Sequence, residues 1–271
     1  MSTALSRDDL LNRFRLTREL SVSLCEPLVP EEWVIQMMED ASPPKWNLGH
    51  TTWFFEQMIC RPFHSDGASA YQPCHHDYAY LFNSYYESVG QRVARNARMS
   101  LGRPTIQQVL DYRDQIDARV EEVVARIDEE EWGQLAPVLE IGIHHEQQHQ
   151  ELLLTDHKFN LSVNPLLPAY QPRANRRGPL SSLIPPSGSR TARPAVDPIR
   201  WIEGPSGLAE IGHTKGETPG FAYDCETPRH RVWLEPYALA DRLITNAEYL
   251  EFLEDGGYEN PLLWMSDGWA T

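Results

Sequence analysis

Cysteine is scarce in this sequence of 271 residues. The four cysteines are Cys25, Cys60, Cys74 and Cys225, and no two of them form a C-x-x-C pair. A disulfide framework and a thiolate zinc site are therefore not expected, because both need cysteines at recurrent close spacings. The pattern fits a reducing compartment, so we expect a cytoplasmic protein. The ten histidines are left as the main source of metal ligands.

Excess positive charge is also lacking. Lys and Arg number 24 against 39 for Asp and Glu, and the formal net charge is -15. Such a chain offers no basic surface for phosphate, so neither nucleic acid nor an anionic membrane is expected as a partner. Long apolar runs are absent too: no stretch of about 18 apolar residues predicts a transmembrane helix, and the first residues do not read as a signal peptide.

Apolar periodicity predicts four long helices in the first 160 residues. In order, they cover residues 8–24, 45–61, 105–128 and the stretch from near Leu135 to Asn160. The Glu129–Gly133 segment is interpreted as a break before the last helix. Four long helices with intervening loops predict an antiparallel bundle over residues 1–160.

The composition changes after this bundle. Residues 161–198 are rich in proline, serine and arginine, which predicts an extended connector. Residues 199–271 alternate short apolar runs with Gly and Pro and then open a helix at Thr245. The predicted strands are Trp201–Gly204, Ala209–Gly212, Phe221–Asp224 and His230–Leu234. The fold class is α+β, and we expect the second, mixed α/β domain to be incomplete because so few residues bury little core.

The last helix of the bundle carries an unusual stripe. His145 and His149 lie four residues apart, about one helical turn, so both imidazoles can reach one metal ion. Ile141, Gln148 and Leu152 fall on the same stripe, which predicts that it faces the core. Imidazoles buried there without partners would cost free energy, and a bound metal would satisfy both.

His50 is the expected third ligand. It shares one side of the predicted helix over residues 45–61 with Trp46 and Gln57. A single histidine in such a place is usually a core residue bonded to a carbonyl, but a histidine pair on another helix favours the ligand interpretation. Three imidazoles without a carboxylate keep the full charge of the metal. They leave up to about three open positions, which favours a thiolate ligand and, with iron(II), oxygen chemistry.

The segment from His145 to His149 also matches H-E-x-x-H, the helix of zinc proteases, in which Glu146 would be the general base. The match is short. Thr155 stands where a metzincin has its third histidine, although Asp156 could be a carboxylate ligand. No strand that could bind a peptide substrate precedes this helix, so the motif alone does not identify a protease.

Several motifs together carry a resemblance to a known family. They are Trp46-Asn-Leu-Gly-His50, Asn83-Ser-Tyr-Tyr86, the helix from His145 to Leu152, Gly-Gly-Tyr258 and the segment from Trp264 to Ala270. With them the chain resembles the sulfoxide synthases of ergothioneine biosynthesis, the hercynine oxygenases. These enzymes join a DinB-like four-helix bundle to a domain of the formylglycine-generating-enzyme type, which is C-type-lectin-like. The resemblance covers nearly the whole chain.

This resemblance implies a non-haem iron(II) centre held by His50, His145 and His149. It also implies a reaction with O2 that joins the imidazole of hercynine, the trimethylated betaine of histidine, to the sulfur of a thiol and oxidises that sulfur to a sulfoxide. The thiol would be cysteine or γ-glutamylcysteine. Gln148 would contact the imidazole of hercynine.

Further roles are implied by the same resemblance. Tyr85 or Tyr86 would supply a proton, and the choice between them stays open. The branch with the Asn-Ser-Tyr-Tyr segment is similar to enzymes that use free cysteine. Arg98 and Arg103 would bind the carboxylate of the thiol, although the residues between them differ from the family pattern.

The family's second domain continues well beyond the position of Thr271. We therefore expect this chain to bind iron but to turn over poorly or not at all. Two alternatives to the iron oxygenase stay open. One is a zinc-dependent hydrolase or transferase of the DinB-like type, and the other is a metal-binding remnant without activity.

Overall fold

The computed structural model describes residues 6–84, 86, 90–171, 196–214, 216 and 220–271. The chain divides into two compact units, and the division falls between residues 185 and 186. The long helices belong to the first unit and the strands to the second. Among the described helices, none is long and apolar enough to cross a membrane.

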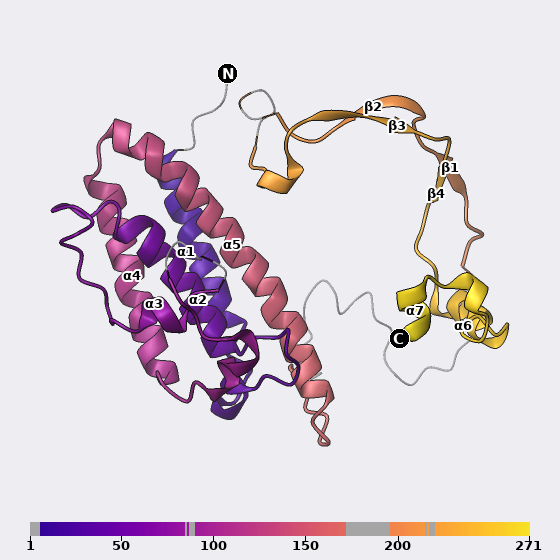
Figure 1. Cartoon of the computed structure of the whole chain (residues 1–271), viewed down its shortest axis with the longest axis horizontal. Helices are drawn as coiled ribbons and strands as arrows, with labels where there is room; N and C mark the ends of the chain where they lie inside the picture. The colour runs from indigo at the N-terminus through magenta and orange to yellow at the C-terminus, as the bar shows by residue number, and fades with distance from the viewer. Residues whose placement is uncertain (1–5, 85, 87–89, 172–195, 215, 217–219) are drawn as a thin grey trace. The chain divides into compact units, whose positions relative to one another are not determined.

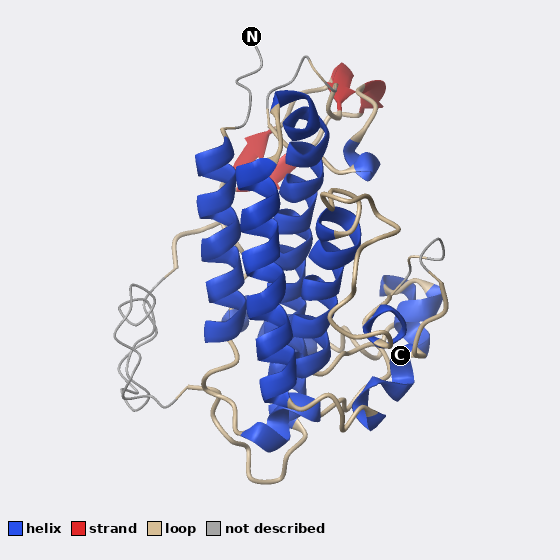
Figure 2. Ribbon diagram, turned by 90° about the vertical axis from the view of Figure 1, so that its left-hand side faces the viewer, coloured by secondary structure: helices blue, strands red, loops and turns tan. Residues whose placement is uncertain are grey.

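Four long helices make up the N-terminal unit, and they lie side by side in both ribbon views (Figure 1 and Figure 2). They are α1 (Arg7–Ser23), α2 (Pro44–Phe55), α4 (Ile106–Arg126) and α5 (Glu129–Ser162). The connections contain η1 (Pro30–Val34), the π-helical η2 (Glu56–Cys60), α3 (Tyr78–Leu81) and η3 (Arg95–Ser100). The predicted four-helix bundle is confirmed.

Capping residues set the helix starts. Ser6, Thr105 and Asp128 each accept a hydrogen bond from the backbone N–H three residues further on, at the starts of α1, α4 and α5. Three glutamates in the first turn of α5 also interact favourably with its dipole. The break predicted at Glu129–Gly133 is therefore wrong. The cap at Asp128 starts the helix there, and α5 continues through Pro137.

The core-facing side of α5 differs from the predicted stripe. Leu139, Ile143 and Leu153 are buried in the bundle core, whereas the side chains of Ile141 and Leu152 are 43% and 44% exposed. The expectation that the stripe faces the core is wrong, because the buried side is rotated by about 100° around the helix. The two histidines of the motif lie at the edge of the core and not at its centre.

A buried charge network links three helices of the bundle. Glu146 of α5 is 0% exposed, and its carboxylate accepts hydrogen bonds from Arg18 of α1 at 2.9 Å and from Ser21 at 2.6 Å. Arg113 of α4 also donates to Glu146, and Arg18 donates to Asp117 at 2.7 Å. Burial alone would raise the pKa of Glu146, but the two guanidinium groups lower it to about 2. The carboxylate therefore stays ionised and paired.

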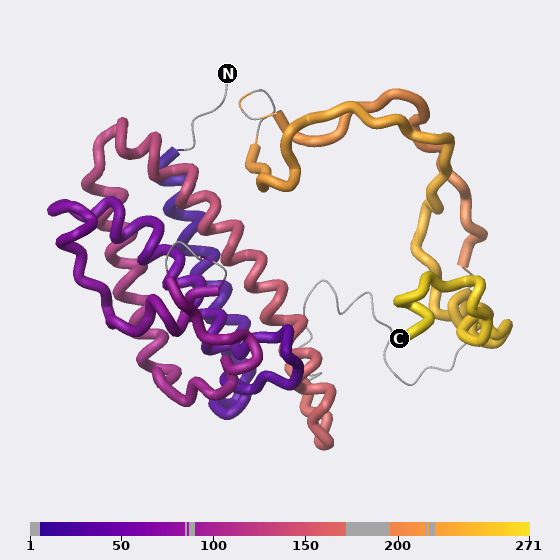
Figure 3. The backbone as a smooth tube through the Cα atoms, in the orientation of Figure 1, coloured from indigo at the N-terminus to yellow at the C-terminus, as the bar shows by residue number. Residues whose placement is uncertain are grey.

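The described residues of the C-terminal unit form two pairs of antiparallel strands, which can be followed in orange in Figure 3. β1 (Trp201–Glu203) pairs with β4 (Ala238–Ala240), and β2 (Gly207–Ile211) pairs with β3 (His230–Leu234). The helical segments of this unit are η6 (Asp224–Glu226), α6 (Asn246–Glu254), η7 (Pro261–Leu263) and α7 (Ser266–Ala270). The unit adds a small β region to a mostly helical chain, so the α+β class is confirmed.

One of the strands predicted for this unit is wrong. The Phe221–Asp224 segment pairs with no described strand and leads into the turn η6. There the backbone N–H of Tyr223 donates to the side chain of Glu226, which closes the turn. Of the described residues from 196 to 271, only Gly257 is buried, in line with the small core expected of this segment. The three-part division at residues 160 and 198 stays a prediction.

We predict that Glu146→Ala destabilises the bundle by about 3–5 kcal/mol, because it leaves the buried Arg113 without a carboxylate partner and Arg18 with Asp117 alone. Urea unfolding followed by the helical circular dichroism signal measures this loss. Glu151→Ala removes an exposed carboxylate from the same helix and should leave the unfolding curve nearly unchanged. Equal stability of the two variants would show that the network contributes little.

Candidate metal centre

Two helices bring the three predicted histidine ligands together. His50 comes from α2, and His145 and His149 come from α5. Each offers one ligand atom, and these atoms lie within 4.8 Å of one another. The ring centroids are 5.0 Å apart for His50 and His145 and 4.7 Å apart for the other two pairs. The spacing of four residues on α5 gives the geometry expected of a histidine pair that shares one ion.

Neighbouring oxygen atoms orient two of these rings. Nδ1 of His50 lies 2.6 Å from the carbonyl oxygen of Phe82, and Nδ1 of His149 lies 2.8 Å from Oδ1 of Asn47. Because both partners are acceptors, each Nδ1 carries the proton, and each Nε2 is left with a lone pair for a metal. Nε2 of His50 lies 3.2 Å from Nε2 of His145.

Aromatic residues of α2 fix the His50 ring. Trp46, four residues before it, stacks on the imidazole at 4.7 Å with an interplanar angle of 11°. Trp53, three residues after it, stacks at 5.6 Å and 17°. Phe54 lies beside the His145 ring at 4.8 Å. The spacing places these rings on the histidine side of α2, so local sequence holds the ligand in one orientation.

Burial keeps the three imidazoles neutral. It lowers the pKa of His145 to about 4, and together with the nearby His145 it lowers the pKa of His149 to about 3. The pKa of His50 also falls well below its ordinary value, first through burial and then through the two other imidazoles. Neutral imidazole is the form that binds metals.

The triad fits a transition metal. Nδ1 of His145 is buried and has no hydrogen-bond partner among the described residues. Neutral imidazoles whose ring nitrogens face one another at 3.2 Å are best satisfied by a cation that accepts their lone pairs. Imidazole suits zinc, copper, nickel and iron alike, so the donor set points to a transition metal and not to calcium or magnesium.

A cavity of about 280 Å³ lies against the triad and includes charged side chains. Arg98 in this cavity is only 4% exposed, and its guanidinium group lies 3.4 Å from the ring centroid of Trp46. It donates hydrogen bonds to Oγ of Ser42 at 2.7 Å and Oγ of Ser84 at 3.3 Å. Arg95 lines the same cavity. Both arginines come from η3, a helix with about three residues per turn, so they lie on one side of it.

The other predicted site residues lie in different places. Tyr86 lines the cavity, is half-buried and packs against Trp53 at 5.3 Å, whereas Tyr85 lies outside the described residues. Gln148 and Arg103 are exposed and are not among the residues that line the cavity. Their predicted roles stay predictions.

One contributor to the site was not predicted from the sequence. It is Asn47, whose position three residues before His50 places it on the same side of α2. Arg95 lies on the same side of η3 as Arg98, while the role of Arg103 stays a prediction. The spacing of three residues between Arg95 and Arg98 predicts that they share one side, but only once the segment is known to form the 3-10 helix η3.

Glu146 does not belong to this site. It is adjacent to His145 in sequence, but its carboxylate points into the core and is bonded to Arg18, Arg113 and Ser21. A buried carboxylate with a pKa of about 2 and charged partners is a poor general base. The H-E-x-x-H motif therefore does not have its protease role in this fold.

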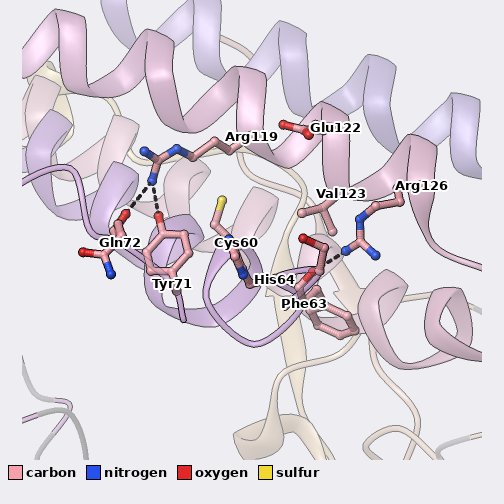
Figure 4. A pocket seen from close by; sticks show the side chains of 10 residues that line it. Cys60, Phe63, His64, Tyr71, Gln72, Arg119, Glu122, Val123 and Arg126 are labelled. Carbon is pink, nitrogen blue, oxygen red and sulfur yellow. Dashed lines mark hydrogen bonds between the residues drawn. The ribbon is translucent and has the colours of Figure 1, made fainter. Parts of the chain in front are cut away.

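A second histidine cluster and a second cavity are weaker candidates. His75, His76 and Asp77 are exposed, and the two imidazole rings stack at 4.6 Å with an angle of 19°, so their in-plane lone pairs do not converge. This second cavity, one of several further cavities, measures about 250 Å³ (Figure 4). Its Arg119 is already bonded to the hydroxyl of Tyr71 at 2.6 Å and to the carbonyl of Gln72 at 3.1 Å.

Comparison with known proteins agrees with the helical fold of the N-terminal unit. Residues 13–153, more than half of the chain, match the family model of the DinB superfamily. The chain is 26% identical over 267 residues to a hercynine oxygenase of Mycolicibacterium smegmatis, which covers 98% of this chain and 55% of that protein. It is 31% identical over 134 residues to a hercynine oxygenase of Mycolicibacterium thermoresistibile, which covers 47% of this chain and 24% of that protein. The chain thus spans at most about half the length of these relatives.

We predict that His50→Ala, His145→Ala and His149→Ala each abolish tight binding of a divalent transition metal. Two imidazoles alone hold such an ion far more weakly than three. Metal content after dialysis, measured by mass spectrometry, reports the loss. His144→Ala is the matched control, because His144 is the neighbour of a ligand but lies 3.2 Å from Arg13 and outside the triad. Retention of the metal by the triad variants, or its loss from the control, would contradict the assignment.

Asn47→Ala should lower metal affinity by about 10–100-fold, because the His149 ring loses the acceptor that orients it. Asn47→Asp keeps an oxygen acceptor for His149 and should keep most of the affinity. Both variants lose the amide donors to the carbonyls of Ser42 and Pro43, so the difference between them isolates the bond to His149. Competition with a chelator measures both affinities, and equal losses in the two variants would reject the orienting role.

Proposed function

This chain belongs to the DinB superfamily, and we propose that it is an O2-dependent, non-haem iron(II) enzyme of the hercynine oxygenase kind. The observation that supports this most is the convergence of His50, His145 and His149 beside a cavity that also contains two arginines. The proposed substrates are hercynine, a thiol such as cysteine, and O2. The similarity to two hercynine oxygenases supports the same assignment.

The proposed reaction balances with O2 as the only oxidant. The C–H bond at the imidazole carbon of hercynine and the S–H bond of the thiol are broken, and a C–S bond and an S–O bond are formed. One oxygen atom ends in the sulfoxide and the other in water, together with the two hydrogens. Iron(II) would supply the redox chemistry of this step when bound.

The protein contributes charge and orientation. Three neutral imidazoles leave the full charge of the metal, which favours the sulfur of the thiol as an anionic ligand. Arg95 and Arg98 line the same cavity and would bind the carboxylate of that thiol, since guanidinium groups suit carboxylates. Holding both substrates at one centre would supply much of the rate through proximity.

Tyr86 is the described candidate for the proton donor. It lines the cavity, and burial raises the pKa of its hydroxyl, so the group keeps its proton at neutral pH. Tyr85 stays the alternative. Gln148 lies one residue before His149 at the exposed edge of α5, where its proposed contact would be with the imidazole of hercynine.

The zinc-dependent alternative has less support from the site. A hydrolase of the H-E-x-x-H kind needs a carboxylate that can take a proton beside the metal, and Glu146 is committed to two arginines on another side of α5. A zinc transferase with three histidine ligands needs no such base. The identity of the metal therefore separates the two proposals, because only the oxygenase needs a redox-active ion.

We predict that iron(II)-loaded protein forms the hercynine sulfoxide in a single-turnover experiment with protein in excess, and that the zinc(II)-loaded protein does not. Mass spectrometry detects the product, and omission of hercynine, of cysteine or of O2 should abolish it. The His50→Ala variant is the control for iron that is not at the triad. If neither metal form makes product and calorimetry shows no binding of hercynine, the proposed function is wrong.

A further inference from the structure

Among the described residues that line the cavity beside the histidine triad, one is acidic. It is Asp156, which lies seven residues after His149 and therefore on nearly the same side of α5. The other charged groups of the lining, apart from the three histidines, are the guanidinium groups of Arg95 and Arg98. A ligand that complements this set carries a positive group as well as a negative one.

Ser42 forms hydrogen bonds with both the carboxylate of Asp156 and the guanidinium group of Arg98. Its backbone N–H donates to Oδ2 of Asp156 at 2.9 Å, and its hydroxyl oxygen accepts from Arg98 at 2.7 Å. Ser42 thus contacts both a carboxylate and a guanidinium group of the lining. The α-ammonium and α-carboxylate groups of an amino acid carry the charges complementary to these two groups.

The carboxylate of Asp156 has few polar partners. The residue is 6% exposed, and only its Oδ2 accepts a hydrogen bond from the described parts of the chain, from the backbone N–H of Ser42. Burial raises the pKa of Asp156, while this hydrogen bond and the charge of Arg95 lower it. A buried carboxylate normally gathers charged or multiple hydrogen-bonding partners, because burial of an ion without them costs several kcal/mol. The cavity is the place from which a further donor can reach it.

We infer that Asp156 determines thiol specificity by binding the α-ammonium group of the thiol substrate, so that the site selects a free α-amino acid thiol such as cysteine. This inference rests on the proposed function. In γ-glutamylcysteine the same nitrogen is an uncharged amide that bears a large acyl group. That substrate would leave the charge of Asp156 without its counterion, and it would have to fit the acyl group into a cavity of about 280 Å³.

The test uses the full chain loaded with cobalt(II), which reports a bound thiolate by its charge-transfer absorption. It is titrated without O2 with cysteine and with 3-mercaptopropionate, which keeps the thiol and the carboxylate but lacks the ammonium group. The two thiols differ in acidity, so their affinities for the wild-type protein cannot be compared directly. The decisive quantity is the ratio of the affinity for cysteine to that for 3-mercaptopropionate, compared between the variant and the wild type. Asp156→Asn keeps an acceptor for Ser42 N–H while it removes the charge.

We expect Asp156→Asn to weaken cysteine binding about tenfold or more and to leave the affinity for 3-mercaptopropionate unchanged. Glu151→Gln, which removes an exposed charge from the same helix, should change neither affinity. An unchanged ratio, or an equal loss for both thiols, would show that Asp156 is only structural and would overturn the inference while the proposed function stands. If the wild-type cobalt protein binds neither thiol, the proposed function is wrong and the inference is wrong with it.

Discussion

The rotation of α5 depends on the buried pairing of Glu146 with Arg18 and Arg113. A carboxylate with 0% exposure needs charged partners inside the bundle. The carboxylate of Glu146 finds them in guanidinium groups from α1 and α4. Because successive residues of a helix are about 100° apart, fixing Glu146 also fixes the directions of its neighbours. His145 and His149 are then turned toward α2, where the third histidine lies. The charge network thus positions the metal centre without touching it.

The position of His50 relative to the histidine pair depends on the close approach of α2 to α5 and to Phe82. A Cβ atom at Gly142 of α5 would lie 2.5 Å from the ring of Phe55 of α2, and one at Gly49 would lie 2.2 Å from the ring of Phe82. Neither distance is possible without movement, so both glycines are needed for the observed packing. The approach at Gly49 brings in the segment whose carbonyl orients His50. Small residues on both ligand helices therefore bring the histidines within reach of one another.

The sequence was sufficient to predict features that produce a local periodic pattern of residues. The four helices and the joining of His50 to the pair on α5 follow from spacing and residue type. The sequence was insufficient for features that depend on contacts with residues far away in the chain. The side of α5 that is buried depends on Arg18 and Arg113, which are remote in sequence, so the histidine stripe was placed in the core when it lies at the edge. Arg98 and Arg103 were named from the family resemblance. The position of Arg95 beside Arg98 depends on the conformation of η3, which leaves no periodic signal in the sequence.

The motif on α5 shows why a short pattern does not define a chemistry. In H-E-x-x-H the glutamate lies about 60–100° around the helix from the two histidines, so its role depends on which neighbours cover each side. In this bundle α2 covers the histidine side and supplies a third imidazole, while α1 and α4 cover the glutamate side and supply two guanidinium groups. The same five residues therefore supply two of the three histidines of the candidate metal centre on one side and anchor the helix on another. With the glutamate committed to the core, an acid–base group for the proposed reaction would come from elsewhere in the cavity, where Tyr86 and Asp156 are the described candidates and Arg95 and Arg98 supply fixed positive charge.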